Sequence, residues 1–141
     1  MNDVYTLELQ TATYGGDTLG RLPDGRAIFV PFALPGEQVR VAVTEEKRGF
    51  ARARLLEVLR PAPQRIAPRC PHFGSCGGCQ YQHLPYLAQC ELKTALVQDQ
   101  LQRIGKLNQP PVRPMLPAAS PWNYRNSIQF HLNEQIGRAH V

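Results

Sequence analysis

Five short segments rich in strand-forming residues occupy the first sixty residues, and Gly and Pro turns separate them. In residues 37–44, three valines alternate with Gln38 and Arg40, which is the period of a half-buried strand. The five segments are 4–13, 20–22, 27–32, 37–44 and 50–59. An open sheet of this size exposes two edges and has little core. The sequence therefore predicts a small closed barrel of the OB-like kind, a mainly β N-terminal domain.

The composition is that of a globular chain, with 43% apolar and 19% charged residues in 141 positions. That length suits one ordinary domain or two small ones. No apolar run reaches the length of a membrane span, and no basic region followed by an apolar core opens the chain. We therefore expect a cytoplasmic, reducing location, no membrane partner, and cysteines that bind metal rather than form disulfides.

The strongest chemical signal is the spacing C-x5-C-x2-C formed by Cys70, Cys76 and Cys79. Thiolates at this spacing are able to converge on one metal centre. Gly77 and Gly78 lie between the last two cysteines, where the absence of Cβ permits positive φ. The motif predicts a metal or cluster site whose three sulfur atoms converge.

The fourth ligand of such a site is not fixed by the spacing. His72, His83 and Cys90 are the candidates if the metal is a tetrahedral structural zinc. Cys90 falls on an apolar helical stripe, however, where a lone cysteine is usually a small core residue. We expect His83 and the preceding Gln82 to support the site, or the start of a helix, rather than to ligate.

Positive charge is concentrated ahead of the cysteine motif. The net charge is +5, and residues 47–69 contain seven Lys or Arg residues against one acidic residue. Arg52 and Arg54 are spaced to lie on one face of a strand, with Arg48 in the turn before it. These three arginines are predicted to bind RNA phosphates, with a solvated strand face as the simpler alternative.

The second half of the chain reads as a linker, a helix and a strand. Residues 61–68 form a Pro-rich linker, and residues 85–105 carry apolar residues at helical spacing. A second Pro-rich stretch precedes a predicted strand over 122–132, with Ile128, Phe130 and Leu132 on one face. Trp122 is expected in the core. Tyr124, Arg125 and Asn126 either contact RNA or form a solvated strand start, and Arg125 is a predicted RNA-binding residue.

Taken in order, these features resemble the iron–sulfur-containing bacterial RNA uracil-5-methyltransferases, whose members include enzymes that methylate 23S rRNA. The resemblance implies a TRAM barrel over 1–60 and a [4Fe–4S] cluster on Cys70, Cys76 and Cys79. In that family the fourth cluster cysteine lies further downstream, and a Rossmann-like domain carries the S-adenosylmethionine site and the catalytic residues. The family's reaction adds a cysteine thiolate to uracil C6 before C5 is methylated.

The resemblance also implies a domain plan. Residues 61–83 would be the linker and cluster motif, 84–107 the helix, and 108–135 the start of a central RNA-binding β domain. Residues 136–141 break the preceding alternation and are predicted to be a non-native tail of a truncated, non-catalytic fragment. We expect a monomer that binds RNA, and ribosomal RNA is the expected partner.

Two alternatives are weighed against this interpretation. One is a stand-alone TRAM-type RNA-binding protein with a structural zinc, although paired C-x2-C knuckles are more typical of zinc. The other is a radical S-adenosylmethionine methylthiotransferase, in which the cluster spacing is C-x3-C-x2-C and the TRAM domain comes last. Both the spacing and the domain order argue against the second alternative.

Overall fold

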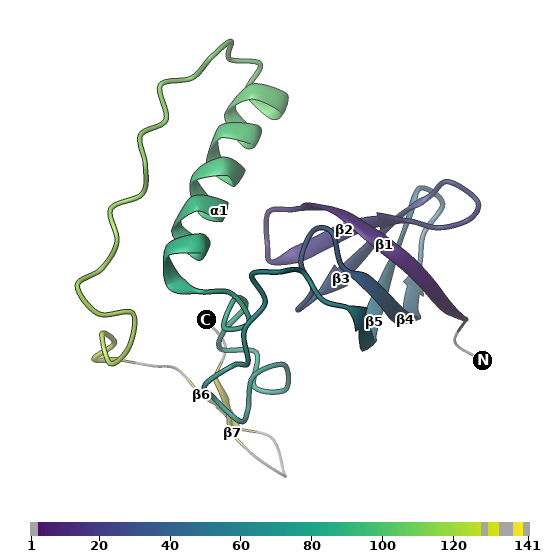
Figure 1. Ribbon diagram of the computed structural model, residues 1–141, viewed down its shortest axis with the longest axis horizontal. Coiled ribbons are helices and arrows are strands. Elements are labelled where there is room, and N and C mark those ends of the chain that lie inside the picture. The colour runs from purple at the N-terminus through teal and green to yellow at the C-terminus, as the bar shows by residue number, and fades with distance from the viewer. Residues whose placement is uncertain (1–2, 128–129, 133–136, 140–141) are drawn as a thin grey trace. The chain divides into compact units, whose positions relative to one another are not determined.

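The computed structural model describes residues 3–127, 130–132 and 137–139, and the chain divides into two compact units. The first unit, Met1–Arg65, is a closed β-barrel. The second, Ile66–Val141, contains the cysteine loop, one long helix and an extended Pro-rich segment (Figure 1).

The barrel has five strands in the order β1-β2-β3-β5-β4, and β4 pairs with β1 to complete the circuit. The strands are β1 (Val4–Ala12), β2 (Asp17–Arg21), β3 (Ala27–Pro31), β4 (Gln38–Glu46) and β5 (Phe50–Arg60). All neighbours are antiparallel except β3 and β5, which pair in parallel through Ile28 and Ala51. The predicted closed barrel is confirmed. The second strand is longer than predicted because Asp17–Arg21 pairs with a strand on each side.

The barrel interior is filled by aliphatic side chains at alternate positions along the strands. The core residues are Leu7, Leu9, Leu22, Ile28, Val30, Ala33, Val39, Val41, Val43, Ala51 and Ala53. Gly20 faces this core from β2, where an added Cβ would lie 2.8 Å from Leu7 Cδ1. A glycine at this position therefore lets β1 and β2 approach closely.

A buried ion pair joins the turn before β4 to the chain that leaves β5. The Glu37 side chain is fully buried, and its carboxylate accepts hydrogen bonds from Arg65 Nη2 at 2.9 Å and from Arg65 Nε. It also accepts from the backbone N–H groups of Leu34 (2.8 Å) and Ala62 (3.1 Å). Arg65 in turn donates to the Phe32 carbonyl at 2.8 Å. Burial raises the pKa of Glu37, but these donors outweigh it and hold that pKa below its usual value.

The backbone of the same turn is tied to β1. The N–H of Leu9 donates to the Glu37 carbonyl at 2.9 Å, and the N–H of Gly36 donates to the Leu9 carbonyl at 2.8 Å. Gly36 has φ of 82°, a conformation that favours glycine. The turn at Pro35–Gly36, together with Glu37, therefore links the end of β3 to β1 and to the chain that follows β5.

The helix predicted over 85–105 is confirmed as α1 (Tyr86–Asp99) followed by a π-helical turn, η1 (Gln100–Ile104). The wider last turn was not predicted. It ends where the N–H of Gly105 donates to the Gln100 carbonyl at 3.0 Å, a bond that spans five residues. Cys90 is buried on α1, whereas Leu87 and Val97 of the same stripe are exposed.

Among the described residues of the strand predicted over 122–132, only β6 (Phe130–Leu132) is a strand, and it pairs antiparallel with β7 (Gly137–Ala139). Residues 122–127 are not a strand, so that part of the prediction was wrong. Asn123 has φ of 59°, which is incompatible with extended backbone. Ile128 lies outside the described residues, and β7 falls within the segment predicted to be a non-native tail.

Of the helices in the described ranges, none combines the length and the apolar character required to cross a bilayer.

Replacing Glu37 with Gln should destabilise the barrel by ~3 kcal/mol, because the change removes the buried carboxylate and leaves the partly buried Arg65 charge without its counter-ion. The matched control is Glu57→Gln, which removes an exposed pair with Arg40 and should cost no more than ~1 kcal/mol. Urea unfolding followed by circular dichroism measures both changes. Equal losses in the two variants would contradict the central role of Glu37.

The same carboxylate should make barrel stability acid-sensitive. Because the folded pKa of Glu37 lies below its ordinary value of 4.5, its contribution is complete above that pH. The contribution is lost as the pH falls through the lower, folded value. The free energy of unfolding of the native chain should therefore decline below pH 4.5 more steeply than that of Glu37→Gln. Parallel pH profiles would count against this assignment.

Candidate nucleic-acid interface and cysteine loop

The outer face of β5 carries two of the predicted RNA-binding arginines. Ala51 and Ala53 point into the barrel core, so the alternation of the strand directs Arg52 and Arg54 outward, where both are exposed. The prediction that these arginines share an exposed face is confirmed. Their surroundings differ, however.

Arg52 is engaged by its own barrel. Its Nη1 lies 3.1 Å from Asp17 Oδ2, and its Nε lies 3.8 Å from Glu45 Oε2. Its guanidinium also lies over the Phe29 ring, 5.9 Å from the centroid. Burial raises the pKa of Asp17, and Arg52 offsets that rise only in part. Arg52 is therefore less available for a phosphate than its exposure suggests.

Three of the six other cations of the basic segment are also paired with carboxylates of the barrel. These pairs are Lys47 with Glu45, Arg60 with Glu8, and Arg65 with Glu37. Within the part of the barrel that the structure describes, Arg48 and Arg54 have no carboxylate at salt-bridge distance. Arg21 of β2 likewise has no carboxylate partner among the described residues and donates to the Gly25 carbonyl at 3.2 Å, so Arg48 and Arg54 are the unpaired cations of the basic segment on this unit, and Arg21 lies outside that segment.

The cysteine loop is shaped by short-range hydrogen bonds. The N–H of Cys70 donates to Gln82 Oε1 at 3.0 Å, and the N–H of Cys76 donates to the His72 carbonyl at 2.9 Å. Gly77 has φ of 78°, as its place between two cysteines predicted. The side chain of Gln82 thus braces the backbone of the first cysteine.

The conformation of a second glycine and a buried histidine also shape the loop. Gly74 also has positive φ, 88°, whereas Gly78 is not among the described residues with positive φ. His83 is buried, with its ring centroid 5.4 Å from that of Phe73, and its carbonyl accepts a hydrogen bond from the N–H of Ile66 at 3.0 Å. His83 therefore anchors the base of the loop.

The four cysteines have different environments. Cys70 and Cys76 are half-buried, Cys79 is exposed, and Cys90 is 7% exposed on α1. Among the residues that the structure describes, no three or more His, Cys, Asp or Glu side chains are grouped so as to hold a metal ion. The convergence expected from the spacing is thus not present in this conformation. Three thiols at accessible positions nevertheless form a donor set that suits a soft metal or an iron–sulfur cluster.

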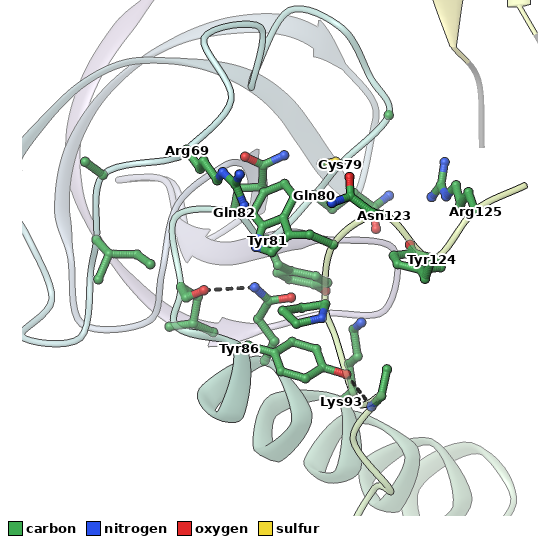
Figure 2. A pocket seen from close by; sticks show the side chains of 18 of the residues that line it. Arg69, Cys79, Gln80, Tyr81, Gln82, Tyr86, Lys93, Asn123, Tyr124 and Arg125 are labelled. Carbon is green, nitrogen blue, oxygen red and sulfur yellow. Dashed lines mark hydrogen bonds between the residues drawn. The ribbon is translucent and has the colours of Figure 1, made fainter. Parts of the chain in front are cut away.

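A cavity of about 770 Å³ lies beside this loop within the second unit. It is lined by residues of the linker, the loop, the first turns of α1 and the 118–125 segment, as Figure 2 shows. Cys79 and Arg125 both line it, so the structure brings one predicted metal ligand and one predicted RNA-binding residue to the same site.

Trp122 also lines this cavity and was not foreseen there. It is 36% exposed and lies under the Arg69 guanidinium at 4.9 Å, so the expectation that it is a core residue was wrong. The sequence analysis counted Arg69 only as part of the basic segment, without placing it at this site, and it did not single out Lys93. The available signal was the mixture of aromatic and basic residues in Trp122–Arg125, and the position of Arg69 beside Cys70.

The barrel is a known domain type. Residues 2–56 match the family model described as TRAM domain. The chain therefore carries a TRAM domain, and beyond it the similarity extends through the cysteine loop and helix. Curated relatives described as RNA methyltransferases are similar to this chain over 76–96% of its length.

Two relatives illustrate that similarity. An uncharacterized RNA methyltransferase of Halalkalibacterium halodurans is 40% identical over 96% of this chain and 30% of its own length. The 23S rRNA (uracil(1939)-C(5))-methyltransferase RlmD of Alkalilimnicola ehrlichii is 48% identical over 76% of this chain and 24% of its own length. The chain thus spans less than a third of these relatives.

Among solved structures, a tRNA (uracil-54, C5)-methyltransferase of Pyrococcus abyssi in complex with S-adenosyl-L-homocysteine is 28% identical. The similarity covers 68% of this chain and 21% of that one, with a TM-score of 0.44. A conserved protein of Methanococcus maripaludis is 34% identical over 39% of this chain and 77% of its own length, with a TM-score of 0.36.

Arg48→Ala and Arg54→Ala should each weaken RNA binding and reduce the slope of log affinity against log salt by about 1, as expected for loss of one phosphate contact. Arg52→Ala should change that slope less, because Arg52 is already paired with Asp17 and Glu45. Titration of labelled RNA at several salt concentrations measures the slopes. An Arg52 effect larger than that of Arg54 would contradict this ranking.

Proposed function

We propose that this chain is the RNA-binding N-terminal part of an S-adenosylmethionine-dependent RNA uracil-C5 methyltransferase that acts on 23S rRNA. The observation that carries the proposal is the homology, through the TRAM domain, cysteine loop and helix, to RNA methyltransferases. The 48% identity to a 23S rRNA uracil-C5 enzyme supports the choice of base and RNA.

In such an enzyme this chain supplies binding and placement. Arg48 and Arg54 neutralise backbone phosphates from the barrel, while Arg125 contributes a further cation beside the cysteine loop. S-adenosylmethionine supplies the methyl group in the rest of the protein. Target bases in folded RNA must leave their stack to react, so the holding of neighbouring nucleotides is a direct contribution to the reaction.

We further propose that Cys70, Cys76 and Cys79 hold a [4Fe–4S] cluster. The support is chemical: three thiols lie on one glycine-containing loop, and Gln82 braces the first of them. Loading requires the loop to draw the three sulfur atoms together, which the exposed position of Cys79 permits. The buried Cys90 is not assigned as a ligand. The bound cluster would cross-link the loop as a structural element.

The cluster assignment is tested by anaerobic purification of the chain. The native chain and Cys90→Ala should be brown and contain iron and sulfide, whereas Cys70→Ser, Cys76→Ser and Cys79→Ser should lose most of both. Metal analysis and visible absorption provide the measurement. A colourless native protein with stoichiometric zinc would instead support a structural zinc site.

The methyltransferase assignment is tested with the product of the whole gene. In the presence of labelled S-adenosylmethionine it should transfer methyl groups to uracil C5 of unmodified 23S rRNA, while the 141-residue chain should bind that RNA without methyl transfer. Nucleoside analysis of the product RNA identifies the modified base. Turnover by the 141-residue chain alone, or methylation at another atom, would overturn the proposal.

A further inference from the structure

The cavity of the second unit combines cations with aromatic rings. Three basic side chains line it, no Asp or Glu side chain is among its lining residues, and each cation lies near a ring. The pairs are Arg69 over Trp122 at 4.9 Å, Lys93 over Tyr81 at 5.9 Å, and Arg125 over Tyr124 at 5.6 Å. Such a lining favours an anion that also presents a flat surface.

Amide side chains add hydrogen-bonding capacity to the cavity. Gln82 is occupied with the Cys70 N–H, and Gln89 donates to the Leu84 carbonyl. The side-chain amides of Gln80 and Asn123, in contrast, form no hydrogen bond with another described residue. Each offers a donor and an acceptor, which is the combination that reads the edge of a nucleobase.

The cavity wall formed by residues 118–125 is attached to α1. The N–H of Ala118 donates to the Tyr86 hydroxyl at 2.8 Å, and the N–H of Met115 donates to Thr94 Oγ1 at 3.0 Å. Figure 2 shows the first of these bonds beside Tyr86, with Tyr124 and Arg125 further along the same segment. These two hydrogen bonds attach the otherwise irregular Pro-rich segment to α1.

We propose that this cavity binds one unpaired nucleotide of the RNA, an inference that rests on the proposed RNA-binding function. The base stacks on the exposed rings, Tyr124 foremost because it is 65% exposed. The phosphate meets Arg69, Lys93 or Arg125, and Gln80 and Asn123 contact the base edge. These residues belong to the second unit, whereas Arg48 and Arg54 belong to the barrel unit.

The chemistry selects an unpaired nucleotide over a duplex. In an A-form duplex the base faces are covered by their neighbours, so a stacking site of this kind receives only a base that has left the helix. Because Cys79 lines the same cavity, the inference places a displaced nucleotide beside the cysteine loop.

The experiment uses the single tryptophan of the chain, Trp122, as a reporter inside the cavity. A single-stranded RNA oligonucleotide should quench Trp122 fluorescence saturably. The same sequence in a perfect duplex should bind, as measured by anisotropy of labelled RNA, with little quenching. Uridine monophosphate at equal nucleotide concentration should quench weakly, because it lacks the flanking phosphates.

Two substitutions test the cavity directly. Tyr124→Ala should weaken single-stranded binding by about 5- to 160-fold, the usual range for loss of one stacked base, while Tyr124→Phe should retain it. Arg69→Ala should also weaken binding. Arg113→Ala, which removes an exposed cation that does not line the cavity, is the matched control and should have little effect on quenching.

The outcomes separate the two proposals. Single-stranded RNA that binds by anisotropy without quenching, or Tyr124→Ala that behaves like Arg113→Ala, would overturn the nucleotide site and leave RNA binding intact. Quenching by uridine monophosphate as strong as that by the oligonucleotide would reassign the cavity to a free nucleotide. Failure of every RNA to bind would overturn the proposed function as well.

Discussion

A buried carboxylate at Glu37 is the constraint on which the barrel depends. A charge without solvent must find its hydrogen bonds within the protein, and Glu37 finds them at Leu34, Ala62 and Arg65. Leu34 follows β3 in the chain, whereas Ala62 and Arg65 follow β5. The backbone carbonyl of Glu37 also accepts a hydrogen bond from the N–H of Leu9 in β1. The ion pair therefore fixes how the strands close and where the chain leaves the barrel.

Local patterns were sufficient to predict the closed barrel, the long helix and the burial of Cys90. Each follows from a regular spacing of apolar residues along the chain, such as the alternating valines of β4 or the helical stripe that includes Cys90. The exposed faces of Arg52 and Arg54 followed from the same rule. These features depend on side chains that are near one another in the chain.

Long-range relations were not accessible in this way. Nothing in the local sequence shows that Glu37 is buried against Arg65, or that Arg52 is neutralised by Asp17. The basic segment accordingly overstated the charge offered to RNA, since ion pairs within the barrel use most of it. Trp122 was misplaced for a related reason: Asn123 takes a left-handed conformation that ends any strand there, and Arg69 covers the indole.

The place of β5 between β3 and β4 determines when the barrel can close during synthesis. β5 is the last barrel strand in sequence, yet it lies between β3 and β4 in the sheet. While the chain is being synthesised, β1 to β4 can pair only as an open ribbon, with the valine face of β4 uncovered. Cooperative closure must wait for β5 to emerge from the ribosome, so the nascent barrel passes through a stage in which it is open to aggregation.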